Sequence, residues 1–170
     1  VPCLLLTFVV LAFFRDPPRS IPRTPGAVVS PADGKIDMIQ TNMDPEAGPV
    51  GGPCITIFLS VLDVHINRAP CAGEVTSLRR RPGLFLNALN PDSTTHNEAN
   101  LIRMRCGRFE VTVNQIAGVI ARRIVCRVQP GRKLKRGERL GLIRFGSRTQ
   151  LCLPPEARLQ AEVGQRVTGA

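Results

Sequence analysis

The sequence predicts a mainly β domain of the α+β class, with a compact β-sandwich or barrel-like core and a hydrophobic helix at the N-terminus. Between residues 27 and 153 the strand-forming residues come in short runs, and no long period of 3.6 residues is present. Glycines divide the second half of this region at intervals that suit short strands joined by turns. Residues 1–14 (VPCLLLTFVVLAFF) carry no charge, which predicts an apolar helical segment.

The apolar N-terminal segment ends at a charged and proline-rich stretch, residues 15–18 (RDPP). Its 14 residues fall short of the ~20 that span a bilayer. Because the chain begins with Val1 rather than Met, we expect residues 1–14 to be a truncated hydrophobic segment that anchors the protein in a membrane. A buried core helix is the alternative, and a signal peptide is disfavoured because no basic region or small-residue cleavage site is present. Residues 15–26 are predicted to be a Pro-rich linker.

Apolar runs predict the individual strands. Residues 28–29 and 35–39 alternate as a strand does, and residues 54–60 (CITIFLS) form a continuous apolar run that predicts a buried strand. Residues 41–53 predict a loop, and the polar residues 87–97 separate two further strand regions. From Pro154 onward we find no strong structural signal. The length suits one domain with its own core, which we expect to span residues 27–170.

The net charge of +10 arises from 23 Lys and Arg against 13 Asp and Glu. Such an excess favours anionic partners, either nucleic acid or an acidic lipid surface, and a solvated basic surface without a partner is the alternative. The chain has no Trp or Tyr, which argues against the exposed rings on which single-stranded nucleic acid stacks. We therefore expect an acidic membrane surface and no nucleic acid as partner.

The six cysteines form no recognisable pattern. None belongs to a CxxC pair and neither histidine lies at ligand spacing, so we expect no zinc site. Because the chain is large and hydrophobic for a disulfide scaffold, we expect buried, reduced thiols and a cytosol-facing location. The cysteines are Cys3, Cys54, Cys71, Cys106, Cys126 and Cys152.

Three segments hold residue types that are unusual in a β protein. Residues 30–34 (SPADG) place Asp33 in a tight turn, residues 63–70 (DVHINRAP) place His65 after the buried run, and residues 145–148 (FGSR) place Ser147 after Gly146. Each segment alone has an ordinary explanation in turn chemistry, a polar strand end or a loop. Together, and in this order, they are far less common.

The chain resembles the phosphatidylserine decarboxylases over nearly its whole length, and their short bacterial and archaeal type in particular. Five segments in the same order carry the resemblance. They are residues 13–17 (FFRDP), 28–36 (VVSPADGKI), 58–75 (FLSVLDVHINRAPCAGEV), 97–98 (NE) and 137–148 (GERLGLIRFGSR).

The resemblance implies a pyruvoyl-dependent lyase that converts phosphatidylserine to phosphatidylethanolamine and CO2. Such enzymes are made as proenzymes that cleave themselves, here between Gly146 and Ser147, into a β chain (1–146) and an α chain (147–170). The first residue of the α chain becomes the covalent pyruvoyl group. An Asp33–His65–Ser147 arrangement would activate the serine, with Asp33 orienting the imidazole, and Gly146 would permit close approach of the hydroxyl.

One departure from the family leaves the roles of the histidines open. Many longer members carry a second histidine three residues after the first, where this chain has Arg68. We expect His65 to serve both self-cleavage and decarboxylation, with help from His96 as the alternative. We also expect Arg68, Arg148 and His96 to contact the lipid substrate, because arginine suits phosphate and carboxylate groups.

An apolar segment and a basic surface together provide the two signals that hold a domain at acidic headgroups. We therefore expect a location at the cell membrane, with the catalytic domain on the cytoplasmic side. The expected partners are phosphatidylserine, the acidic membrane surface, the protein's own cleaved chains and, from the family, a second copy in a homodimer.

Two other functions suit parts of the sequence. The spacing of Gly131, Gly137 and Gly141 is similar to the turns of biotinyl or lipoyl carrier domains, but arginines flank Lys133 and Lys135 where such domains have Met or Ala. A nucleic-acid-binding module would explain the charge and would bind in a salt-dependent manner, but it leaves the N-terminal segment without a role.

Overall fold

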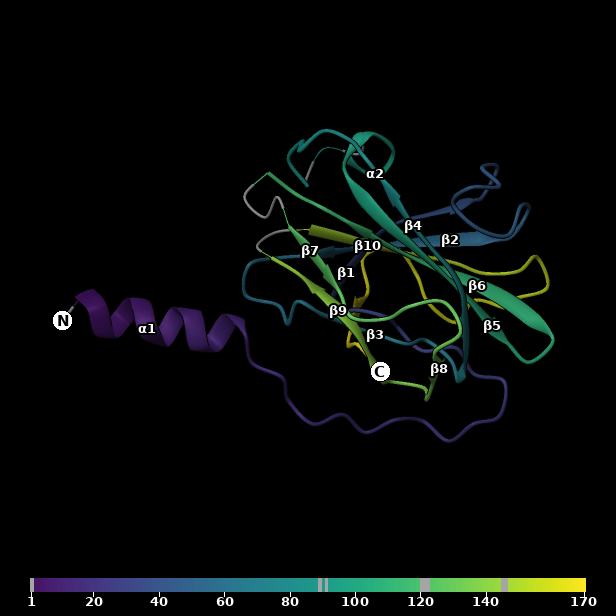
Figure 1. The fold of residues 1–170 in the computed structure, drawn as a ribbon, viewed down its shortest axis with the longest axis horizontal. Coiled ribbons are helices and arrows are strands. Elements are labelled where there is room, and N and C mark those ends of the chain that lie inside the picture. Colours follow the sequence, from purple (N-terminus) through teal and green to yellow (C-terminus); the bar gives the residue numbers. More distant parts are fainter. Residues whose placement is uncertain (1, 89, 91, 120–122, 145–146) are drawn as a thin grey trace.

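One large antiparallel sheet dominates the structure. The computed structural model describes residues 2–88, 90, 92–119, 123–144 and 147–170. The sheet has the strand order β11-β1-β2-β10-β6-β5-β4-β8 and curls into a half-barrel (Figure 1). Its strands are β1 (Gly34–Thr41), β2 (Pro53–Leu59), β4 (Gly73–Arg81), β5 (Ala99–Cys106), β6 (Phe109–Ile116), β8 (Lys133–Leu134), β10 (Ser147–Cys152) and β11 (Arg166–Val167).

A second sheet of three strands packs against the middle of the large one. It has the order β3-β9-β7, with β3 at Ile66–Arg68, β9 at Arg139–Ile143 and β7 at Ile124–Cys126. Asn67 of β3 donates from Nδ2 to Oγ1 of Thr149 in β10 (2.9 Å), and Nε2 of Gln115 in β6 donates to Oδ1 of Asn67 (2.8 Å). These buried contacts join the two sheets, and the predicted mainly β fold is confirmed.

The central strands of the large sheet are paired with other strands along both edges, and their side chains are buried. Strand β2 lies between β1 and β10, and both of its neighbours run antiparallel to it. The apolar run predicted as a buried strand is confirmed as β2, in which Ile57 and Leu59 are almost fully buried. Strand β10 is buried at every one of its six residues.

The N-terminal helix predicted from the sequence is confirmed as α1 (Pro2–Phe13), which projects away from the β sheets in Figure 1. Leu4 and Leu11 on this helix are largely exposed, whereas Phe13 at its end is buried. No helix within the described residues is both long enough and apolar enough to cross a membrane. Membrane anchoring through residues 1–14 stays a prediction, as does the division into a linker at 15–26 and one domain at 27–170.

The expectation of reduced cysteines is wrong, because two disulfides are present among the described residues. Cys54 of β2 is bonded to Cys152 of β10, and Cys71 is bonded to Cys106 at the end of β5. The partners are 98 and 35 residues apart, so no local spacing marks them. Strand register brings the first pair together, since Cys152 lies directly opposite Cys54 in the ladder. Cys126 is a free thiol.

The C-terminal residues are more ordered than their sequence indicates. Strand β11 pairs with β1, and beyond it the N–H of Gly169 donates to Oδ1 of Asp33 over 2.7 Å. The N–H of Ala170 donates to the carbonyl of Ser30 over 3.0 Å. A two-residue strand has no periodicity, so sequence patterns could not reveal it. The short helix α2 (Ser93–His96) lies in the polar stretch between β4 and β5.

Candidate active site

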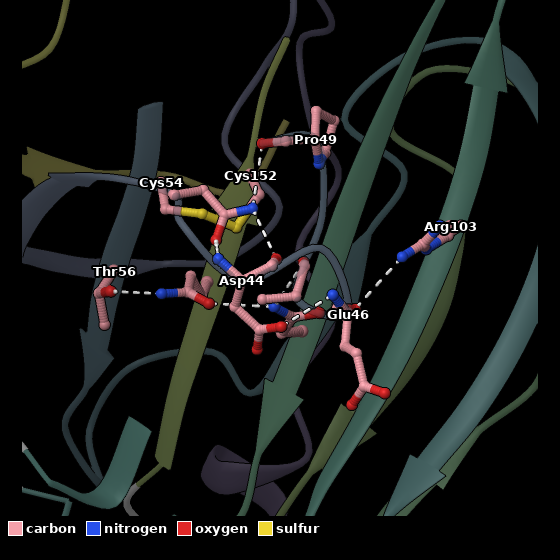
Figure 2. Close-up of a disulfide and its surroundings, with 11 residues drawn as sticks. Asp44, Glu46, Pro49, Cys54, Thr56, Arg103 and Cys152 are labelled. Atoms are coloured by element: carbon pink, nitrogen blue, oxygen red, sulfur yellow. Dashed lines mark hydrogen bonds between the residues drawn. A yellow bond between two sulfur atoms is a disulfide. The ribbon is translucent and has the colours of Figure 1, made fainter. Parts of the chain in front are cut away.

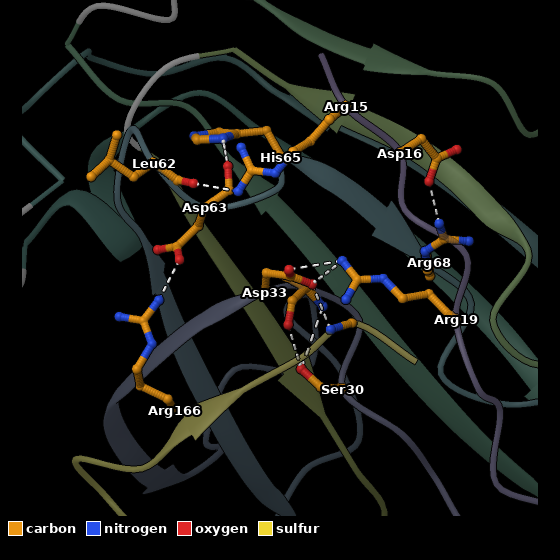
Figure 3. A network of polar contacts seen from close by, with 12 residues as sticks. Arg15, Asp16, Arg19, Ser30, Asp33, Leu62, Asp63, His65, Arg68 and Arg166 are labelled. Carbon is orange, nitrogen blue, oxygen red and sulfur yellow. Dashed lines mark hydrogen bonds and ion pairs between the residues drawn. The ribbon is translucent and has the colours of Figure 1, made fainter. Parts of the chain in front are cut away.

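A closed turn follows β2 and fixes the conformation of the segment that contains His65. The N–H of Asp63 donates to the carbonyl of Ser60, and the N–H of Ser60 donates to Oδ2 of Asp63, both over 2.9 Å. Asp63 also forms an ion pair with Arg166 of β11. These contacts hold the buried Asp63 in one orientation, from which its carbonyl reaches the imidazole (Figure 3).

His65 is buried with only 2% of its surface exposed. Its Nδ1 lies 2.9 Å from the carbonyl oxygen of Asp63. Because a carbonyl can only accept, Nδ1 carries the proton and Nε2 of the neutral ring carries the lone pair. The ring of Phe13 packs against the imidazole with the ring centroids 4.4 Å apart. His65 is thus held in the tautomer that leaves Nε2 as a base.

Burial lowers the pKa of His65 below its ordinary value. The carbonyl and carboxylate of Asp63 act in the opposite direction, Arg15 adds to the lowering, and the charge of Asp33 raises the pKa. The effect of burial is the largest, so the imidazole is neutral at pH 7. A neutral imidazole can accept a proton from a neighbouring hydroxyl.

Ser147 is the first residue of β10 and is fully buried. Among the described residues, its hydroxyl has no hydrogen-bond partner. A buried polar atom without a partner costs free energy, and such atoms in native folds often have a functional reason. Ser147 lies directly opposite Leu59 in the ladder with β2. The large sheet therefore fixes the position from which the hydroxyl projects.

Strand pairing relates the position of the imidazole to that of the hydroxyl. Residues i and i+2 of a strand point to the same face, so Asn67 marks the face of His65 and Thr149 marks the face of Ser147. These faces meet, because Nδ2 of Asn67 donates to Oγ1 of Thr149 over 2.9 Å. His65 continues the β3–β9 ladder, since its carbonyl accepts from Ile143 over 3.2 Å. The chain then passes from Ile143, the last residue of β9, to Ser147. His65 and Ser147 therefore lie toward the same end of the hydrogen-bonded pair Asn67–Thr149.

Asp33 lies beside this site but is bonded to other groups. Both of its carboxylate oxygens accept from one guanidinium nitrogen of Arg19, over 2.9 and 2.8 Å, and Oδ1 also accepts from the N–H of Gly169. Figure 3 shows the carboxylate directed toward Arg19, below the turn of Asp63 and His65. Its position is fixed by Gly34, where a Cβ would lie 2.2 Å from the carbonyl oxygen of Phe58. Nδ1 of His65 contacts the Asp63 carbonyl, and the orientation of the imidazole by Asp33 stays a prediction.

The remaining predicted residues lie in different surroundings. Arg68 is buried, donates to the carbonyl of Gly137 and pairs with Asp16. Arg148 points to the face of β10 opposite to that of Ser147, where it is 2.7 Å from Asp37 and also donates to the carbonyl of Ala88. His96 is exposed at the end of α2, where its Nδ1 contacts the hydroxyl of Thr95. Gly146 lies outside the described residues.

The sequence matches the family described as phosphatidylserine decarboxylase over residues 6–170. Curated relatives named phosphatidylserine decarboxylase proenzyme are similar along nearly the whole chain. The relative from Nitrosomonas eutropha is 46% identical over 169 residues, which are 98% of this chain and 77% of the relative. The relative from Cupriavidus taiwanensis is 42% identical over 172 residues, which are 100% of this chain and 79% of the relative. The relative from Chlorobaculum parvum is 41% identical over 166 residues, which are 98% of this chain and 77% of the relative.

This chain belongs to the phosphatidylserine decarboxylase family. Membership confirms the resemblance that the five sequence segments indicated, and it makes the protein a decarboxylase, a lyase.

A phosphatidylserine decarboxylase implies a pyruvoyl group, and Ser147 fits the formation of that group. Its hydroxyl is fully buried, lacks a partner among the described residues and begins a strand that is fixed on both sides. Within the described residues, no group of His, Cys, Asp and Glu could hold a metal ion. Ser147 also begins a strand of the large sheet, whereas the preceding strand along the chain, β9, belongs to the small sheet.

Several residues of the site were not anticipated from the sequence. The turn residue Asp63 supplies the carbonyl that orients His65, and Arg166 and Gly169 reach the site from the C-terminus. His65 and Asn67 are two residues apart, and strand periodicity could have indicated that they lie on the same face. No signal marks Gly169, because it is a backbone donor that only the folded chain brings to Asp33.

Proposed function

We propose that this protein is a proenzyme that cleaves itself between Gly146 and Ser147 and then decarboxylates phosphatidylserine with the pyruvoyl group formed from Ser147. The observation that carries the proposal is the hydroxyl of Ser147 at the start of β10, which is buried and has no hydrogen-bond partner among the described residues. The names of the relatives, which include the word proenzyme, support it.

In the first reaction His65 acts as the base. Its Nε2 takes the proton of the Ser147 hydroxyl while the oxygen attacks the carbonyl carbon of Gly146. The peptide bond breaks, the amine of Ser147 takes a proton, and an ester joins Gly146 to the serine oxygen. Loss of the α-proton of Ser147 then expels the Gly146 carboxylate. The dehydroalanine that remains takes up water and releases ammonia, which leaves a pyruvoyl group at the start of the α chain.

The second reaction uses the same surroundings. The pyruvoyl carbonyl supplies a sink for the electrons that departing CO2 leaves behind. His65 then returns a proton from Nε2 to the carbon that has lost the carboxylate. The fixed tautomer of His65 suits both steps, because Nδ1 keeps its proton and donates it in a hydrogen bond to the Asp63 carbonyl while Nε2 gains and loses its own proton. A direct part for His96 stays a prediction.

An apolar hollow supports a lipid as the substrate. A cavity of about 780 Å³ lies between the large sheet and the segments at 22–31 and 154–161. Ile57 and Leu151 line it, and they point to the same face of the sheet as Ser147 because their positions differ from Leu59 and Ser147 by even numbers. Acyl chains are the part of phosphatidylserine that such a surface would accommodate.

Arginines around a second hollow suit the phosphate of the lipid or of its neighbours in the bilayer. The hollow, of about 500 Å³, is lined by Arg68, Arg127, Arg132, Arg139 and Glu138. Arg68 and Arg139 both pair with Asp16, three residues after α1, so this basic surface lies close to the segment that we propose to be in the membrane. Arg148 is bound to Asp37, and its contact with substrate stays a prediction.

The site faces the end of α1, which supports contact with a membrane. Phe13 packs on His65, and Arg15 donates to the carbonyl of Leu62, whose side chain is 79% exposed. We propose that this face lies on the cell membrane and that the catalytic domain is on the cytoplasmic side, in a homodimer. Disulfides are more common in oxidising compartments, so the side of the membrane is tested separately from the activity. Protease protection of intact spheroplasts and light scattering of the purified protein test the side and the dimer.

The decisive experiment is the intact mass of the purified protein beside that of Ser147→Ala. We expect the wild type to give two chains that split between residues 146 and 147, with the α chain starting at a pyruvoyl group. The variant should stay whole and be at least as stable, because it removes a buried hydroxyl that has no partner in the part of the chain that the structure describes. Release of CO2 from phosphatidylserine by the wild type alone would complete the assignment. A single intact wild-type chain in the presence of acidic lipid would overturn it.

A further inference from the structure

The Cys54–Cys152 disulfide lies across the proposed cleavage site. Cys54 belongs to the part before residue 146, and Cys152 lies five residues after Ser147. The second disulfide, Cys71–Cys106, has both cysteines before the cleavage site. Of the two, only the first can join the β chain to the α chain after self-cleavage.

We propose that Cys54–Cys152 is a covalent cross-link that holds the α chain, and with it the pyruvoyl terminus, on the β chain. This inference rests on the proposed self-cleavage. The bond forms when the two thiols give two electrons and two protons to an acceptor disulfide, which is released as two thiols. The acceptor is a low-molecular-weight or protein disulfide.

The fold brings the two sulfur atoms together without any rearrangement. Cys54 and Cys152 are directly opposite each other on adjacent antiparallel strands, with their Cα atoms 4.1 Å apart. Residues directly opposite each other on antiparallel strands come close enough for a disulfide. The rest of β10 is paired along its length with β2 and β6, so the strand register holds Cys152 in place.

The loop between β1 and β2 covers the cross-link (Figure 2). Cys54 and Cys152 are 1% and 0% exposed. At Gly48 of this loop a Cβ would lie 2.6 Å from the Cβ of Cys152, so the backbone packs directly on the disulfide. Asn42 fixes the loop by donating to the carbonyls of Asp44 and Pro49, both over 3.0 Å. Since exchange requires access of a thiolate to a sulfur atom, the folded protein should resist reduction at this bond.

The cross-link has a consequence for the catalyst. Self-cleavage leaves the α chain attached through strand pairing and side-chain packing, and a short strand can leave a sheet when the sheet opens locally. A disulfide five residues from the new terminus prevents escape during such opening. The strand then returns to its place with the reactive terminus beside His65.

The test compares the purified wild type with and without a reducing agent on denaturing gels, after thiols are blocked with N-ethylmaleimide at lysis. We expect the cleaved protein to migrate as one species without the reducing agent and as two with it. Cys152→Ser should separate into two chains without reduction. The matched control Cys71→Ser should stay linked, because its disulfide lies within the β chain.

Tryptic mapping gives a readout that depends neither on cleavage nor on a variant. In the unreduced protein, peptide 36–68, which contains Cys54, should be joined to peptide 149–158, which contains Cys152. Both peptides carrying the N-ethylmaleimide label would overturn the inference. If the chain is uncut, the proposed function fails, but this map still tests the disulfide. If the chain is cut and the two chains separate without reduction, the proposed function stands and the cross-link does not.

Discussion

Burial of His65 sets the pH range in which its Nε2 can accept a proton. The base must be neutral, and burial lowers its pKa below the ordinary value of 6.5. We therefore expect the rate of self-cleavage to rise with pH through a midpoint below 6.5 and to be constant at neutral pH. Quenched samples of freshly refolded protein, followed by mass, measure this rate. A midpoint above 6.5 would contradict the role of burial.

The same shift affects folding stability. The folded pKa of His65 is depressed, so the unfolded chain binds a proton that the folded chain does not. The contribution of the neutral histidine is therefore complete above about pH 6.5 and is lost as the pH falls toward the folded pKa. His65→Gln should slow cleavage about 10²-fold or more. It should also reduce the change of the free energy of unfolding with pH in this range, as measured by urea titrations. A variant with an unchanged curve would show that His65 does not titrate on folding.

Asp33 is expected to act through its charge rather than through a hydrogen bond to the imidazole. When His65 takes the proton of Ser147 it becomes a cation, which a nearby carboxylate stabilises. Arg19 opposes this effect because its charge is bonded to the same carboxylate. We predict that Asp33→Asn slows cleavage about tenfold or more, whereas Arg19→Gln leaves it unchanged or faster. Equal losses in both variants would mean that Asp33 matters only as a structural partner of Arg19.

Secondary-structure elements differ in how far the sequence predicts them. Strand β2 was predictable because its sequence is a run of mostly apolar and β-branched residues, which is typical of a buried strand. Strand β3 and strand β11 have three and two residues, too few for a period, and their places follow from tertiary pairing. The motifs identified Asp33, His65 and Ser147. They could not show that Asp63 orients the imidazole, because that contact is made by a backbone carbonyl, which every residue has.

Strand β11 is predicted to matter for the site more than for the fold. It pairs with β1 at the edge of the sheet, but residues 166–170 supply contacts to both Asp63 and Asp33. Removal of residues 166–170 should slow self-cleavage, while the unfolding temperature changes by only a few degrees because few buried contacts are lost. Arg166→Ala tests the contact to Asp63 alone. Cleavage at the wild-type rate in the truncated chain would show that neither contact positions the site.

At the scale of the whole molecule, the exposed apolar residues and the positive charge determine how the protein meets a bilayer. Leu62 is 79% exposed beside the end of α1, and Arg15 fixes its backbone. Met43 is equally exposed, at 77%, but it lies in the β1–β2 loop, on the other side of the molecule from α1 (Figure 1). The two residues therefore form a matched pair that is similar in size and exposure and lies on different faces.

If the face of α1 and Leu62 lies on the membrane, Leu62 buries its side chain in the lipid. Full burial of a leucine contributes about 2 kcal/mol, so Leu62→Ser should weaken binding to phosphatidylglycerol-containing vesicles roughly 30-fold. Met43→Ser should bind as the wild type does. Because the chain carries a net charge of +10, added salt should weaken the binding of all three proteins alike, by screening their attraction to acidic headgroups. Equal loss in both variants, measured by co-sedimentation, would place the membrane surface elsewhere on the molecule.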